Sequence, residues 1–220
     1  MKNSTDGAPA AGALAGSGSP DAPSVSAGAL AVILVPAVAI ALFFTHHASD
    51  FLQFDRTAIS HGELWRLFTG HLVHFDGSHL LWDVAAFTVL ASLLRTLSWR
   101  RWLLLLLGSS LVISIGVLVL PPHFELYRGL SGLDSALFAA ALALRLRQAR
   151  LNHDRPAALL LAILAALFLA KCGYESLTHA TVFDHAALYT PAPVAHLIGA
   201  ITGAAAVLPS RLGKRTIAAT

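Results

Sequence analysis

Apolar residues gather along the chain in six blocks, which are separated by polar or basic connections. The hydrocarbon core of a bilayer is about 30 Å thick, so a crossing helix needs roughly 20 mostly apolar residues. Blocks near that length occupy residues 28–44, 78–95, 101–120, 131–148, 156–173 and 191–208. They predict an all-α membrane protein, a bundle of six transmembrane helices in a domain that spans residues 28–208.

The segments outside the six blocks are polar. Residues 1–27 are mainly Gly, Ala, Ser and Pro, which predicts a disordered tail because such a composition cannot bury a core. Residues 209–220 form a short basic tail. The long connection over 45–77 is expected to hold short interfacial helices, where Trp65 and Phe68 suit the depth of the lipid headgroups.

Composition agrees with a bilayer environment. The chain is 56% hydrophobic and 12% charged, whereas soluble proteins carry about 25% charged residues. A net charge of +3 is weak evidence for nucleic acid, and we expect no such partner. The single cysteine, Cys172, leaves neither a disulfide framework nor a thiolate metal site.

The basic residues predict the orientation. Most of the 15 lysines and arginines fall in the two termini and in the connections after the second and fourth blocks. The positive-inside rule therefore places both termini in the cytoplasm. Helices two, four and six then begin at the outer face, which brings His79, Ser131 and His196 to one depth.

Ser131 is the candidate nucleophile. Its hydroxyl needs a base to take its proton, and neutral histidine is the commonest one. It lies in Gly129-Leu130-Ser131-Gly132 at the expected start of the fourth helix, where unpaired N–H groups would face a developing oxyanion. The alternative is that Ser131 merely caps this helix.

His196 is the candidate base. It shares one helix face with Gly199 and Gly203, and these small residues allow another helix to pack closely. The fourth helix offers a comparable face that includes Gly132, so meeting of the two faces would bring His196 beside Ser131. The alternative is a packing histidine that binds a backbone carbonyl.

A histidine-rich stretch, His71 to His79, precedes Asp83. His79 and Asp83 share a helix face, and the His79 imidazole could donate to an oxyanion. The rival interpretation is a metal site, because histidine and carboxylate are plausible ligands. The histidine spacings do not form one helical face and the chain has no HExxH motif, so we expect no metal and no cofactor.

Together these residues resemble the rhomboid family of intramembrane serine proteases, whose motifs occur here in the family's order. They are Trp65-Arg66, then His74 and His79 with position 83, then Gly129-Leu130-Ser131-Gly132, and then His196 with Gly199 and Gly203. The resemblance implies that Ser131 attacks and that His196 acts as base and then as acid, without an essential carboxylate. It also implies that His79 and the Ser131 N–H bind the oxyanion, and that His74 orders the second helix and the loop before it.

Three positions depart from the general family pattern. Asp83 stands where the family usually has asparagine, and we expect it to orient His79. Ser135 stands where many rhomboids have an aromatic ring that packs on the histidine. Asp134 lies one turn below Ser131, and we expect it to pair with a nearby polar group rather than to polarise His196.

The Trp82-Asp83 pair and the compact chain without an appended soluble domain resemble the bacterial rhombosortase branch. That resemblance implies transmembrane substrates with a C-terminal Gly-Gly sorting tail, an apolar helix and basic residues. The expected protein is an intramembrane serine endopeptidase of the inner membrane, with its active site towards the periplasmic side. The alternatives are a catalytically inactive rhomboid-like protein that binds membrane clients, and a metal-dependent membrane hydrolase.

Overall fold

The computed structural model describes residues 27–45, 47–120, 124–178, 180 and 192–208. Apart from Ala27, the tails predicted over 1–27 and 209–220 lie outside these residues. The described part is mostly α-helical, which confirms the predicted class. Five predicted blocks correspond to α1 (Ala27–Phe43), α5 (Gly77–Leu93), α8 (Ser131–Leu151), α9 (Arg155–Thr178) and α10 (Pro193–Val207).

The remaining block is helical but not uniform. It begins as α6 (Trp99–Leu103), passes through a π-helical stretch over Leu104–Gly108, and continues as α7 (Ser109–Val119). Among the described helices, this stretch over Trp99–Val119 and the helix Arg155–Thr178 are long and apolar enough to cross a bilayer by themselves. The apolar helices Gly28–Phe43, Gly77–Leu93 and Pro193–Val207 are shorter. Six membrane crossings and cytoplasmic termini therefore stay predictions.

The connection after α1 holds short helices, as expected, together with a strand pair that the sequence pattern did not indicate. The helices are α2 (Ala48–Leu52), α3 (Arg56–Ser60), α4 (Arg66–Thr69) and a 3-10 turn over Gly70–Leu72. Strand β1 (Phe54–Asp55) pairs antiparallel with β2 (Leu126–Tyr127), with Phe54 opposite Tyr127. This pairing ties the connection to the segment that leads into Ser131.

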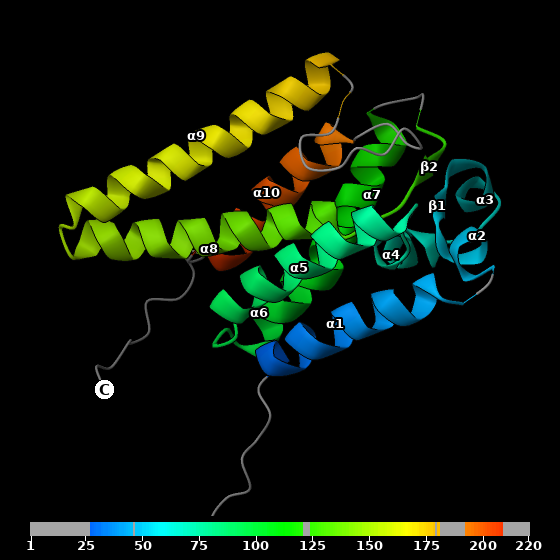
Figure 1. Cartoon of the computed structure of the whole chain (residues 1–220), viewed down its shortest axis with the longest axis horizontal. Coiled ribbons are helices and arrows are strands. Elements are labelled where there is room, and N and C mark those ends of the chain that lie inside the picture. Colours follow the sequence, from blue (N-terminus) through cyan, green and yellow to red (C-terminus); the bar gives the residue numbers. More distant parts are fainter. Residues whose placement is uncertain (1–26, 46, 121–123, 179, 181–191, 209–220) are drawn as a thin grey trace, which may run out of the picture.

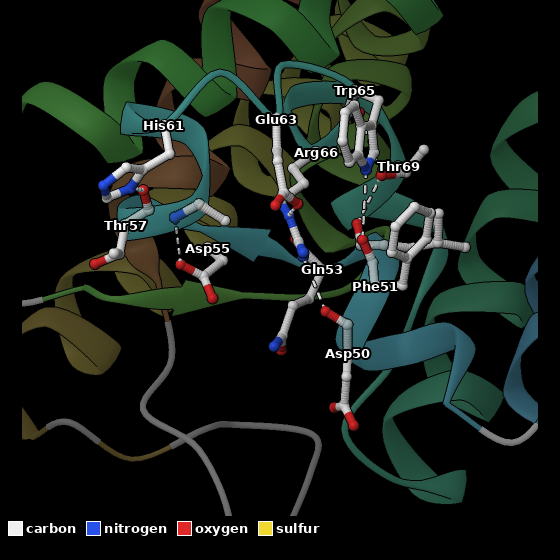
Figure 2. Close-up of polar contacts among 12 residues, drawn as sticks. Asp50, Phe51, Gln53, Asp55, Thr57, His61, Glu63, Trp65, Arg66 and Thr69 are labelled. Carbon is white, nitrogen blue, oxygen red and sulfur yellow. Dashed lines mark hydrogen bonds and ion pairs between the residues drawn. The ribbon is translucent and has the colours of Figure 1, made fainter.

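Arg66 holds this connection together from within (Figure 2). Its guanidinium is nearly buried, and Nε lies 2.7 Å from a carboxylate oxygen of Glu63. Nη1 donates to the carbonyl oxygens of Asp50 and Gln53, each at 2.9 Å. One charged side chain therefore satisfies two backbone carbonyls at the C-terminal end of α2 and binds a carboxylate just before α4, which explains how a short irregular segment keeps a defined shape.

Helices α8 and α10 make the most extensive contact in the described bundle. The contact is close because Gly203 of α10 has no Cβ. A Cβ at this position would overlap the carbonyl group of Ala136 in α8. Helix α9 lies at one edge of the bundle next to α8 (Figure 1), and it contacts both α8 and α10. Its surface is mostly exposed, and its two buried residues are Cys172 and Glu175.

Candidate active site

The segment before Ser131 takes a course that only glycine allows. Gly129 has φ +115°, in the left-handed region that side chains rarely adopt. Its N–H donates to the carbonyl of Gly70 at 3.2 Å. A Cβ at Gly129 would lie 2.5 Å from His79 Nε2 and 2.9 Å from Asp83 Oδ2. The glycine thus lets the start of α8 press directly against the polar face of α5.

Ser131 and His196 meet at the interface of α8 and α10. The Ser131 Oγ lies 3.1 Å from His196 Nε2, which is a hydrogen-bond distance. The sequence placed these residues at a common depth, and the structure brings their side chains into contact. Gly199, one turn after His196, packs so closely on α8 that a Cβ there would overlap the carbonyl oxygen of Gly132.

The other ring nitrogen of His196 faces a carboxylate that the sequence reasoning missed. Glu175 Oε2 lies 3.3 Å from His196 Nδ1 and 2.8 Å from Lys171 Nζ. The predicted fifth apolar block ended at residue 173, whereas α9 continues to Thr178 and carries Glu175 on its last turns. Lys171 and Glu175 stand four residues apart on one face of α9, which is the spacing at which oppositely charged side chains of a helix pair.

Asp83 gathers the hydrogen-bond donors that the sequence assigned to an oxyanion. Its Oδ2 accepts the Ser131 N–H at 3.1 Å, and it lies 3.2 Å from Nε2 of both His79 and His74. The Ser131 N–H lies in the first turn of α8 and has no acceptor within the helix, so the Asp83 carboxylate also satisfies a donor of the helix terminus. Asp83 was expected to orient His79, and that role stays a prediction; the contact of Asp83 with the Ser131 N–H was not foreseen.

His74 and His79 are held edge to face, with ring centroids 5.1 Å apart. The turn between them ends at Asp76, whose side chain accepts the N–H groups of Ser78 and His79 and thereby caps α5. Both imidazoles place Nε2 3.2 Å from the same oxygen of Asp83. Within the described residues, no group of three potential ligands has the arrangement of a metal site.

His71, the first histidine of the same stretch, binds α7 instead. Its Nε2 lies 3.2 Å from the carbonyl oxygen of Ser110 and 3.1 Å from Ser114 Oγ, whose own proton goes to the carbonyl of Leu67. His71 Nε2 is therefore the donor to both. Burial lowers the pKa of His71 to about 4, so the ring stays neutral and structural.

Asp134 and Ser135 line the site from the first turns of α8. Ser135 donates its hydroxyl proton to the Ser131 carbonyl at 2.8 Å. Asp134 is buried, and its Oδ1 has no hydrogen-bond partner among the described residues, so the expected pairing with a polar group is not seen for that oxygen. The carboxylate beside His196 Nδ1 is that of Glu175.

These residues line a cavity of about 590 Å³ between α5, α8, α9 and α10. Ser131, His196, His79 and Glu175 give it a polar end, while aromatic side chains give it an apolar wall. The aromatic lining includes Phe75, Trp82, Phe138 and Phe168. Phe138 of α8 stacks on Phe168 of α9 at 5.3 Å. A nucleophile, a base and clustered donors thus face a space that suits an apolar peptide segment.

Comparison with known proteins agrees with these motifs. The family model described as "Rhomboid domain" matches residues 61–211, which include every candidate residue described above. A protein of Bacillus subtilis (strain 168), named "Putative rhomboid protease YdcA", is 32% identical over 108 residues. The aligned part covers 49% of this chain and 54% of that protein. The chain therefore spans about half the length of the curated relative it matches.

Proposed function

The chain belongs to the rhomboid family, and from that premise we propose that it is an intramembrane serine endopeptidase. Membership makes it an integral membrane protein, and the family and the relative's name both suggest a protease. The observation that carries the proposal is the 3.1 Å separation of Ser131 Oγ and His196 Nε2 inside a cavity.

In the first half of the reaction, Ser131 Oγ attacks the carbonyl carbon of the scissile peptide bond while His196 Nε2 takes the hydroxyl proton. The carbonyl electrons move onto oxygen, which becomes an oxyanion. The Ser131 N–H and His79 Nε2 are the donors that stabilise it, and one such donor typically lowers the barrier by around 3 kcal/mol. As the C–N bond breaks, His196 returns the proton to the leaving amine, and an acyl ester remains on Ser131.

In the second half, a water molecule attacks the ester carbonyl while His196 accepts a proton from it. The ester C–O bond then breaks, the proton passes to Ser131 Oγ, and the carboxylic acid product leaves. Both oxyanions need the Ser131 N–H and His79 Nε2 as donors. In the free protein these two groups face Asp83 Oδ2. The Asp83 carboxylate must therefore move off these donors when the substrate binds.

The substrates we propose are membrane-anchored proteins. The apolar wall of the cavity favours a transmembrane segment, whose backbone must unwind locally to offer a peptide bond to Ser131. The hydropathy blocks and the distribution of basic residues support a chain that crosses the inner membrane six times, with cytoplasmic termini and the site towards the periplasm.

Within this class we favour substrates with a C-terminal Gly-Gly motif that precedes an apolar helix and basic residues. The support is the Trp82-Asp83 pair, which resembles the rhombosortase branch. Glycine-rich backbone at the cleavage site also suits the mechanism, because glycine resists helix formation by about 1 kcal/mol per residue and so eases local unwinding.

The test is co-expression in a bacterial host with a tagged reporter that carries this tail. Wild type is expected to cleave it, whereas Ser131→Ala and His196→Ala are not. Ser92→Ala, the same substitution at a hydroxyl that bonds only within α5, serves as the matched control. Normal cleavage by either active-site variant would overturn the mechanism.

The same experiment separates the finer proposals. A wild-type enzyme that leaves the Gly-Gly reporter intact but cuts another transmembrane reporter would reject the branch and keep the protease. A wild-type protein that binds reporters and cuts none would favour the inactive client-binding alternative.

A further inference from the structure

Glu175 is the one carboxylate on α9, and it is turned inward. Its side chain is nearly fully buried, whereas most of the helix around it is exposed. A carboxylate at membrane depth is costly unless it is paired or serves a function. Lys171, one turn earlier, binds Oε2 at 2.8 Å, and the same oxygen lies 3.3 Å from His196 Nδ1.

The chemistry of His196 requires an acceptor at this position. To take a proton from Ser131, Nε2 must carry a lone pair, so the ring proton must be on Nδ1. That proton is buried and needs a partner, which also fixes the orientation of the ring. Glu175 Oε2 stands at ion-pair distance from Nδ1, although the contact is too bent for an aligned hydrogen bond.

An ion pair with Lys171 holds the Glu175 side chain in position. The ammonium and carboxylate are four residues apart on one helix, the spacing at which side chains meet. Lys171 and Glu175 both line the cavity. Because the pair balances its own charge, α9 can carry an acid to the histidine without leaving an isolated charge in the bundle.

We propose that Glu175 is a positioning residue that holds His196 in the tautomer able to deprotonate Ser131, so that this chain works with a Ser131–His196–Glu175 triad. The inference rests on the proposed protease function and changes one part of it. The family resemblance implies a dyad without an essential carboxylate, whereas here α9 supplies one.

The experiment measures kcat and KM for reporter cleavage by purified enzyme in detergent micelles. Glu175→Gln should lower kcat by about 10²-fold or more, because an amide can donate to Nδ1 and so favour the wrong tautomer. KM should change by less than about threefold, since Glu175 acts through His196 rather than through substrate binding. Glu175→Asp keeps the charge and should recover most of the lost kcat.

The matched control is Glu125→Gln, the same substitution at an exposed residue outside the cavity lining, which should leave kcat unchanged. A kcat for Glu175→Gln within about threefold of wild type would overturn the proposal. So would a Glu175→Asp variant as slow as Glu175→Gln, since packing rather than charge would then matter.

A measurement on the wild-type protein covers the case in which Glu175→Gln does not fold. In ¹⁵N-histidine NMR spectra, the His196 signal, assigned by its loss in His196→Gln, should show a proton on Nδ1 and a lone pair on Nε2. The opposite tautomer would overturn the proposal. Cleavage by Ser131→Ala would instead reject Ser131 as the nucleophile and with it the proposed serine mechanism, so the two failures are distinguishable.

Discussion

Replacing Gly199 with alanine tests whether the catalytic contact depends on how closely α10 packs on α8. The new Cβ would overlap the carbonyl oxygen of Gly132 and would lie 3.1 Å from its carbonyl carbon. Carbon–oxygen contacts normally stand about 3.3–3.6 Å apart, so the helices must separate by roughly 1 Å. The Ser131–His196 distance of 3.1 Å would then approach 4 Å, beyond a hydrogen bond.

The expected loss follows from these distances. Overpacking of this kind typically costs about 1–3 kcal/mol, so the variant should still fold. A misplacement of about 1 Å in a catalytic group can cost about 10²-fold in rate, so kcat should fall by that order. Reporter cleavage in detergent micelles gives kcat, and a thermal unfolding midpoint on the same sample shows that the bundle is intact.

Gly173→Ala is the matched control. It makes the same substitution in α9, where a Cβ would meet nothing within 4 Å. This variant should cleave as fast as wild type and unfold at the same temperature or slightly higher, because alanine favours helix. Wild-type kcat in Gly199→Ala would refute the view that helix contact sets the geometry of the site.

Two further predictions concern the polar residues. Asp83→Asn should retain or increase kcat/KM, because a neutral amide still accepts from His79 and Ser131 N–H but leaves these donors more readily than a carboxylate does. The buried His71 should make the stability of the fold depend on pH. Its pKa is about 4 in the folded protein and 6.5 in the unfolded chain, so as the pH falls the unfolded chain takes up the proton at a higher pH. This contribution is complete above about pH 6.5 and is lost as the pH falls towards 4, by about 3 kcal/mol.

Each prediction has its own contrary outcome. A more than tenfold loss of kcat/KM in Asp83→Asn would mean that the charge itself takes part in catalysis. For His71, the unfolding midpoint in detergent is compared at pH 7 and pH 4.5 with that of His71→Gln, which cannot titrate. Equal drops in both proteins would show that other groups account for the acid sensitivity.

The helical framework could be predicted because hydropathy records it directly. Each of the six apolar blocks is helical in the described residues, with bounds a few residues from those expected. The sequence also predicted that Ser131 and His196 meet, because small residues on α10 and α8 indicate that these two helices pack with their backbones close together. The π-helical stretch over Leu104–Gly108 left no trace in a run of leucines, which suit either helix type.

The polar contacts across helices were harder to foresee. Glu175 lies beyond the predicted end of its apolar block, so nothing local connected it with His196 on another helix. The contact of Asp83 with the Ser131 N–H depends on the left-handed turn at Gly129, which sequence spacing does not reveal. Such contacts follow from the angles between helices and not from the periodicity of any one helix.

The most direct test of the central claim is covalent labelling of the purified protein with a fluorophosphonate, followed by mass spectrometry of the labelled peptide. Wild type should carry one label, on Ser131, and labelling should be lost in Ser131→Ala and strongly slowed in His196→Ala. A wild-type protein that takes no label, or a Ser131→Ala variant that labels at the wild-type rate, would contradict the assignment of Ser131 as an activated nucleophile.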